Sequence, residues 1–238
     1  SKDDVPWVRD QMWAPDVVHK NEKYYLVFPA RDKEGNFRLG IATAEKPDGP
    51  FIPEAHCIEG SFSIDPAAFM DDDGKVYVYF GGLWGGQLEK YQNGSFDPSG
   101  REPEKDKPAL LPMCAVMSED MLSFAEAPRG VQILDEKGEP ILAGDEEKRY
   151  FEDPWMHKYK GTYYLSYSTG TTHRVVYATG DNPFGPFTYR GHILEPVIGW
   201  TTHHSIVEFR GKWYLFYHDC ELSGGINHRR CVKYLSLI

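Results

Sequence analysis

The stretch YFEDPWMHKYKGTYYLSY, residues 150–167, decides the fold, because it runs from two carboxylates into a strand, a short turn and a second strand rich in aromatic side chains. The aromatic half of this pattern recurs along the chain. It aligns with KYYLVF at 23–28, KVYVYF at 75–80 and KWYLFY at 212–217. Four copies of one hairpin predict an all-β chain built from repeated units, as in the blades of a β-propeller.

A third apolar segment follows each hairpin, as a blade requires. These segments are residues 37–44, 115–118, 174–179 and 229–234. In a propeller the first strand of every blade lines the central channel, so residues far apart in the sequence converge there. Asp65 and Asp153 occupy the same position of their units, directly before a proline, and His203 aligns with them. We therefore expect these three side chains to share a small pocket.

Composition limits the classes of protein that the chain can belong to. At 238 residues, with 41% apolar and 14% aromatic side chains, it is long enough for one large all-β domain over residues 1–238. The formal net charge of −10 argues against a nucleic-acid partner, because phosphates would be repelled. No run of 18 apolar residues is present, so we expect no membrane span.

The four cysteines and the N-terminal residues bear on the compartment. The cysteines lie far apart without CxxC spacing, and we expect thiols, which favours a reducing compartment such as the cytoplasm. The N-terminal residues do not form a signal peptide. A periplasmic or secreted protein stays possible, because a mature chain would look the same.

Four short motifs in order resemble glycoside hydrolase family 43, a family of β-xylosidases and α-L-arabinofuranosidases built on a five-bladed propeller. They are WAPD at 13–16, SIDP at 63–66, FEDP at 151–154 and THHS at 202–205. Each is weak alone, but each is followed by its aromatic hairpin. The resemblance covers essentially the whole chain and is greatest to the exo-acting xylosidase and arabinofuranosidase branch.

The resemblance implies roles for two carboxylates. Glu152 matches the general acid, and Asp65 matches the aspartate that tunes the pKa of this acid and helps orient it. The family often has Glu-Gly-Pro where this chain has Glu-Asp-Pro, so Asp153 stands in the glycine position and is the rival candidate for the acid. The alternative is that Asp65 and Glu152 only cap strand ends.

The residues before Trp13 lack the motif that supplies the family's general base. Only Asp3, Asp4 and Asp10 precede it, without the strand and hairpin that should follow a base. We expect a chain with about four blades, an incomplete catalytic domain that lacks the first blade and the closing C-terminal strand. The family would invert the anomeric centre with its two carboxyls about 6.5 to 9.5 Å apart.

Substrate contacts are expected from aromatic and charged residues beside these motifs. Sugar rings stack on indole and phenyl faces, which makes Trp13, Trp84 and Phe62 candidates, although most aromatics of such a chain belong to the core. Arg230 matches a family arginine that points to the terminal sugar, with Arg229 as the out-of-phase alternative. Asp16 is a further candidate, but an aspartate that closes such a turn commonly binds backbone amides instead.

His203 matches an axial histidine that, in the resembled family, often faces a calcium ion and its water shell. Calcium prefers oxygen ligands, so most of the shell would be water or carboxylate. We expect His204, on the opposite strand face, to be a packing residue. No histidines and cysteines have zinc spacing.

The resulting hypothesis is a glycosidase that removes terminal xylose or arabinose from plant cell-wall polysaccharide or oligosaccharide. Both pentoses stay open, because the selecting contacts lie on loops. The alternative from another class is a carbohydrate-binding propeller without catalysis, which the missing base favours. A structural or protein-binding propeller is a third reading, disfavoured by the presence of Asp65, Glu152, His203 and Arg230 together.

Overall fold

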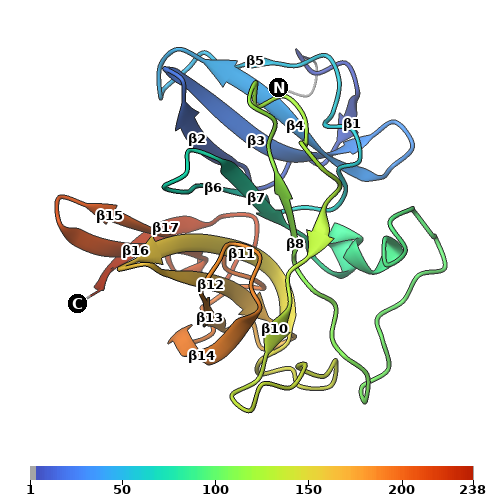
Figure 1. Ribbon diagram of the computed structural model, residues 1–238, viewed down its shortest axis with the longest axis vertical. Coiled ribbons are helices and arrows are strands. Elements are labelled where there is room, and N and C mark those ends of the chain that lie inside the picture. Colours follow the sequence, from blue (N-terminus) through green and yellow to red (C-terminus); the bar gives the residue numbers. More distant parts are fainter. Residues whose placement is uncertain (1–3, 238) are drawn as a thin grey trace. The chain divides into compact units, whose positions relative to one another are not determined.

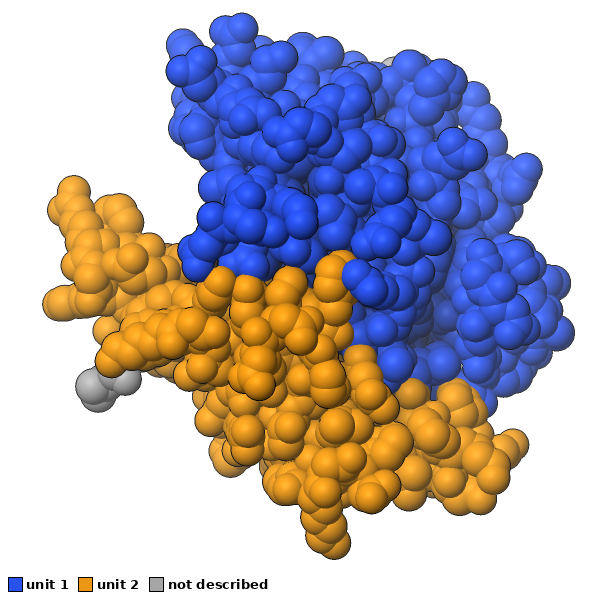
Figure 2. Space-filling model, in the orientation of Figure 1, with its two compact units in different colours: residues 1–102, 110–131 blue, residues 103–109, 132–238 orange. Residues whose placement is uncertain are grey.

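The computed structural model describes residues 4–237, so Asp3, one of the three aspartates before Trp13, lies outside the described residues. The chain divides into two compact units, which Figure 2 shows in two colours. Unit 1 comprises residues 1–102 and 110–131, and unit 2 comprises residues 103–109 and 132–238. Each unit contains two sheets built on two of the four antiparallel hairpins (Figure 1).

The first sheet of unit 1 has β3 (Lys23–Asp32) at its centre, with β2 (Asp16–Lys20) and β4 (Phe37–Ala44) beside it. Two short strands, β1 (Val8–Asp10) and β5 (Ile52–Pro53), extend the sheet by pairing with β3 and β4. Asn21 and Glu22 join β2 to β3 with positive φ angles of 50° and 60°. Such a two-residue turn matches the twist of a hairpin, which explains why the register of the pair is regular.

The second sheet of unit 1 runs in the order β6 (Ala67–Met70), β7 (Val76–Phe80), β8 (Met113–Val116) and β9 (Arg129–Gly130). Every residue of β7 is buried, because both of its faces are covered. A long connection between β7 and β8 contains two short 3₁₀ turns, η2 (Trp84–Gly86) and η3 (Leu88–Lys90). The connection positions Trp84, one of the predicted sugar contacts.

The first sheet of unit 2 contains the opening stretch of the sequence. Its strands are β11 (Tyr150–Tyr159), β12 (Thr162–Thr169), β13 (Val175–Gly180) and β14 (Phe187–Leu194), all antiparallel. The short β10 (Ile133–Leu134) pairs in parallel with β14. Leu165 and Tyr167 on β12 are fully buried, so the aromatic strand forms the core of its sheet as the pattern predicts.

The second sheet of unit 2 has three strands, β15 (His204–Phe209), β16 (Lys212–Asp219) and β17 (Cys231–Leu237). A 3₁₀ turn, η4 (Glu221–Ser223), lies in the connection between β16 and β17. Leu215, at the centre of β16, is fully buried. Burial of such a side chain contributes about 1.5 to 3 kcal/mol of stability.

An aspartate joins the two sheets within each unit. In unit 1, Asp16 on β2 accepts a hydrogen bond of 2.8 Å from the backbone N–H of Ala68 on β6. In unit 2, Asp153 on β11 accepts one of 3.0 Å from the backbone N–H of His204 on β15. The indole of Trp155 adds a second link, a hydrogen bond of 2.9 Å to the carbonyl of Ile206. Side chains of one sheet therefore complete the hydrogen bonding of the next.

The four predicted hairpins are confirmed, and all four cysteines are free, as expected. The expectation of a single catalytic domain over residues 1–238 stays a prediction. Within residues 4–237, no helix has the length and apolar character needed to cross a bilayer.

Candidate active site

Glu152 lies near the start of β11, where the strand is irregular. It is opposite Ser168 of β12. The pairing register shifts once between Tyr150 and Glu152 and again between Glu152 and Trp155. Bulges of this kind bend a strand and re-aim its side chains. The Glu152 side chain is half-buried, and among the described residues of unit 2 no hydrogen bond or ion pair holds its carboxyl. The carboxyl is therefore available to a ligand.

Asp153 has a backbone conformation that L-residues seldom adopt. Its φ is 59°, in the left-handed region that glycine occupies without strain, and the residue is only 1% exposed. Asp65, at the equivalent position of unit 1, has the same conformation, with a φ of 56°. Aspartate tolerates this region better than most residues when its carboxylate is hydrogen-bonded locally.

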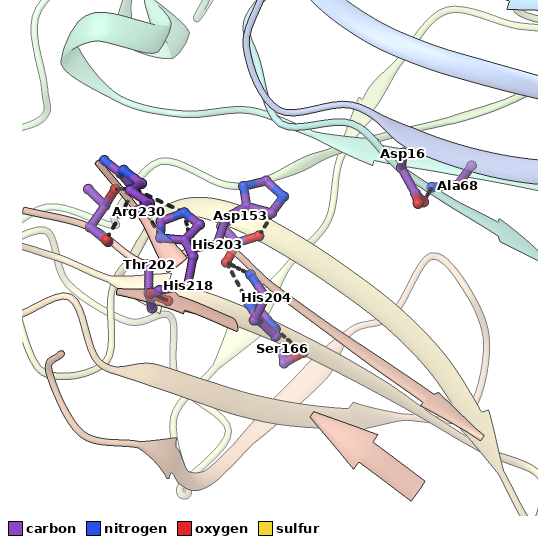
Figure 3. Close-up of polar contacts among 10 residues, drawn as sticks. Asp16, Ala68, Asp153, Ser166, Thr202, His203, His204, His218 and Arg230 are labelled. Carbon is purple, nitrogen blue, oxygen red and sulfur yellow. Dashed lines mark hydrogen bonds and ion pairs between the residues drawn. The ribbon is translucent and has the colours of Figure 1, made fainter. Parts of the chain in front are cut away.

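The Asp153 carboxylate organises a buried network (Figure 3). Its Oδ2 accepts from the backbone N–H and from the ring Nδ1 of His204, at 3.0 and 2.5 Å. The other ring nitrogen of His204, Nε2, lies 2.7 Å from the hydroxyl of Ser166. Burial lowers the pKa of His204 to about 3, so the ring is neutral, with Nδ1 as donor and Nε2 as acceptor. The network fixes the position of the backbone next to Glu152.

Burial raises the pKa of the two neighbouring carboxyls, Glu152 and Asp153. It raises the pKa of Glu152 to about 8, with further repulsion from Asp153 and partial compensation from the positive charge of Arg230. Burial also raises the pKa of Asp153 to about 7, against the lowering effects of His203 and of the His204 N–H. Two adjacent carboxyls in such surroundings do not both ionise readily at neutral pH. A proton is therefore held at this position.

Arg230 lies beside this pair, immediately before β17. It donates to the carbonyl of Asn227 at 2.9 Å and contacts Thr201, and one guanidinium nitrogen lies 2.9 Å from Nε2 of His218 (Figure 3). Burial, followed by the charge of Arg230, lowers the pKa of His218 to about 4. The neutral ring also accepts the backbone N–H of His203 at 3.0 Å. Arg230 is thus held in one orientation although it is exposed.

His203, the predicted calcium ligand, contacts a carboxylate oxygen. Its Nε2 lies 3.1 Å from Oδ1 of Asp153, and this oxygen accepts no aligned hydrogen bond from the described residues. Within residues 4–237 no group of three His, Cys, Asp or Glu side chains could enclose a metal ion. The residues present therefore fit a calcium ion only in a site made mainly of water, with Oδ1 of Asp153 and Nε2 of His203 as its protein donors.

The remaining predicted residues belong to unit 1. Trp13 and Trp84 are 38% and 42% exposed, and the Trp13 ring packs on Gly85, the neighbour of Trp84. Phe62 is only 5% exposed and stacks on Tyr91, so a sugar contact for it stays a prediction.

Two acidic candidates also lie in unit 1. Asp65 is 6% exposed. The Asp16 carboxylate accepts backbone N–H groups of Val17 and Ala68, and burial raises the pKa of Asp16 to about 6. This is the backbone-binding role weighed for it from the sequence.

The structure thus brings together Glu152, His203 and Arg230 in unit 2, and it places Trp13 against Gly85, the neighbour of Trp84, in unit 1. The pairing of Asp65 with Glu152 stays a prediction, because the two residues belong to different units. Sequence reasoning missed His218, and it missed the polar partners of His204. Their positions depend on pairing between strands, for which the sequence carries no local signal.

A bladed all-β chain in which burial raises the pKa of a carboxyl beside imidazoles and a guanidinium has the features of a protein that carries out acid–base chemistry on a polar ligand. Comparison with known sequences identifies the family. The profile of glycosyl hydrolases family 43 matches residues 1–233, and the chain belongs to that family. It is therefore a member of a family of enzymes that hydrolyse glycosidic bonds, and the prediction from its four motifs is confirmed.

Curated relatives are similar over nearly the whole chain. A xylosidase/arabinosidase of Bacteroides ovatus is 57% identical over 237 residues, which cover 100% of this chain and 73% of the relative. The xylosidase/arabinosidase 43A of Humicola insolens is 59% identical, with 97% of this chain and 73% of the relative covered.

Solved structures agree with the fold. A family 43 β-xylosidase/α-arabinofuranosidase from a compost microbial metagenome, in complex with xylotriose and in a calcium-free form, has a TM-score of 0.97 and 61% identity. The match covers 99% of this chain and 73% of that one. A family 43 enzyme of Xanthomonas citri in complex with xylotriose also has a TM-score of 0.97, at 53% identity, over 99% of this chain and 72% of that one. The expected fold class, four blades of a five-bladed propeller family, is confirmed.

Proposed function

We propose that this protein removes terminal xylose or arabinose from plant cell-wall polysaccharides or oligosaccharides, with inversion at the anomeric carbon. The observation that carries the proposal is the Glu152 carboxyl, which is half-buried, unengaged within its unit and raised in pKa to about 8. A carboxylic acid that retains its proton at neutral pH can protonate the leaving oxygen of a glycoside. The names of the relatives, xylosidase and arabinosidase, support a pentose as the sugar released.

Each site residue has a proposed role. Glu152 is the general acid, and Asp65 raises the pKa of Glu152 and helps orient it. Arg230 binds the terminal sugar, because its guanidinium is held rigidly by Asn227 and His218 beside Glu152. Trp13, Trp84 and Phe62 are proposed substrate contacts from unit 1, whereas both carboxylate oxygens of Asp16 accept backbone N–H groups. Among residues 4–237 we assign no base.

Calcium is proposed to bind beside His203. The donor set consists of His203 Nε2 and Asp153 Oδ1 with water completing the shell, so we expect weak binding. A bound divalent cation would supply positive charge near the buried Asp153. The chain's own residues hold and position the proton on Glu152.

Release of pentose tests the proposal. The protein, prepared at the full length of its relatives, is incubated with xylobiose, with xylotriose and with 4-nitrophenyl β-xyloside and α-arabinofuranoside. Proton NMR of the first product then reports the anomer released. We expect xylose or arabinose of inverted configuration. Release of no pentose from any of the four substrates would refute the proposal.

A carbohydrate-binding propeller without catalysis is the second candidate, favoured by the lack of an assignable base. Isothermal titration calorimetry with xylotriose, run beside the activity assay, separates the two. Binding without turnover in the full-length protein supports the second candidate, whereas turnover that is lost in Glu152→Gln supports the enzyme.

A further inference from the structure

His173 is a buried histidine that the proposed roles do not use. It lies in the turn between β12 and β13, is 7% exposed and has a φ of 54°. Both of its ring nitrogens are buried without a hydrogen-bond partner among the described residues. A buried polar group left unpaired costs about 1 to 3 kcal/mol, so a folded protein seldom retains one without a use.

The surroundings of His173 connect it to Glu152. Its ring packs edge-on against Phe151, the residue before Glu152, with the centroids 5.1 Å apart. The turn follows the end of β12, and β12 pairs antiparallel with β11, so the turn lies at the end of the sheet where β11 begins, close to Glu152. Ser168, directly opposite Glu152 in this register, is fully buried, and its hydroxyl also lacks a partner within the described part of the chain. Unsatisfied polar atoms therefore gather at this end of the sheet.

The turn that carries His173 is rigid. The hydroxyls of Thr169 and Thr172 lie 2.6 Å apart, and the backbone of Thr169 bonds to that of Arg174 at 2.9 Å. At Gly170 an added Cβ would lie 2.8 Å from the carbonyl oxygen of Glu146, so the chain approaches that segment as closely as a glycine permits. The position of the imidazole is therefore set before any ligand arrives.

An exposed tryptophan covers the other side of the imidazole. The Trp200 ring packs against His173 with the centroids 4.7 Å apart and is itself 51% exposed. The backbone N–H of Trp200 donates to the side chain of Asn227, and the carbonyl of Asn227 accepts from Arg230. Trp200 and Arg230, the proposed sugar-binding arginine, are thus held by one residue.

We propose that His173 and Trp200 form a sugar-contacting pair beside Glu152, in which the exposed indole turns to pack on the C–H face of a pentose ring and thereby uncovers the imidazole, which hydrogen-bonds a hydroxyl of that ring. This inference rests on the proposed function and names two residues of that site that the family resemblance does not assign. Burial lowers the pKa of His173, so the ring is neutral, with one donor and one acceptor. A sugar hydroxyl is both an acceptor and a donor, and it matches this pair of atoms.

The test measures binding separately from catalysis. Xylotriose is titrated by calorimetry into the full-length protein carrying Glu152→Gln, alone and combined with His173→Phe or Trp200→Ala. Phenylalanine retains the ring packing but removes both nitrogens, so we expect Kd to rise about tenfold, with an unchanged or higher unfolding temperature. For Trp200→Ala, which removes an exposed ring, we expect a rise of about five- to tenfold.

His157→Phe is the matched control. His157 lies on β11, five residues after Glu152. It also has a buried ring nitrogen that lacks a partner among the described residues, but its ring stacks on Tyr164 of β12. Its substitution should leave Kd unchanged. An unchanged Kd for both His173→Phe and Trp200→Ala, with turnover retained in the parent enzyme, would overturn this inference and leave the proposed function standing. A parent that releases no pentose refutes the proposed function instead, and weakened xylotriose binding in the two variants would still support the pair.

Discussion

Replacing Glu152 with glutamine should abolish protonation of the leaving group and leave substrate binding intact. With a pKa of about 8, Glu152 retains its proton at pH 7, whereas at its ordinary value of 4.5 it would not. The protonated fraction would be about nine-tenths in the first case and about 0.3% in the second, a ratio of roughly 300. This ratio is the advantage that burial gives to the acid, and Glu152→Gln removes the acid while it preserves shape.

Substrates with different leaving groups make the loss measurable. For xylobiose, whose leaving hydroxyl needs a proton, we expect kcat to fall by about a thousandfold, within the range typical of general acids. For 4-nitrophenyl β-xyloside, whose phenolate leaves without help, a loss of about tenfold or less is expected. KM should change little for either substrate, because the amide retains the contacts of the carboxyl.

The pH dependence of kcat shows which protonation state of Glu152 is active. The active form of Glu152 is the protonated one, and its pKa is raised, so kcat of the parent enzyme should fall as the pH rises through about 8. This alkaline limb should be absent in Glu152→Gln. If the variant retained more than about a third of kcat on xylobiose, or retained the alkaline limb, the assignment of the acid would be wrong, and Asp153 would become the candidate.

Three further outcomes are expected. Asp153→Ala removes the oxygen that accepts both hydrogen bonds from His204, so two buried donors lose their partner; we expect about 2 to 3 kcal/mol of lost stability and an unfolding midpoint lower by about 5 to 10 °C in calorimetry, and an unchanged midpoint would contradict the network. Arg230→Lys removes the planar fork that lies against His218, so KM for xylobiose should rise about tenfold with kcat within about twofold, and a loss confined to kcat would speak against a binding role. Chelation with EDTA should lower kcat, and added Ca²⁺ should restore it with a midpoint of about 0.1 to 1 mM, as expected for a site with few protein oxygens; indifference to EDTA would remove His203 from the metal ligands.

The repeated hairpins could be predicted from the sequence because their signal is local. Alternating aromatic residues define the second strand of each unit, and two-residue turns such as Asn21-Glu22 define its start. Glu152, His203 and Arg230 could be selected because each lies in a short motif of its own. The structure places all three in one unit.

The side-chain contacts between sheets could not be predicted from the sequence. His204 was expected to be a packing residue, and it is 2% exposed, but its ring also links Asp153 to Ser166 on another strand. Alternation along a strand predicts which face a residue occupies and says nothing about its partner there. The environment of His173 is likewise set by Phe151 and by Trp200, which is distant in the sequence.

The aspartates that join neighbouring sheets bear on how such chains evolve. Asp16 satisfies a backbone amide at Ala68, and Asp153 satisfies one at His204, so within each unit the first sheet holds an acceptor that the second sheet needs. Exchange or duplication of a gene segment that encoded one sheet alone would separate the aspartate from the backbone N–H that it binds. The N–H would then lack its acceptor. The heritable module is therefore a sheet together with the first strand of its successor, and recombination breakpoints should be tolerated best just after that strand.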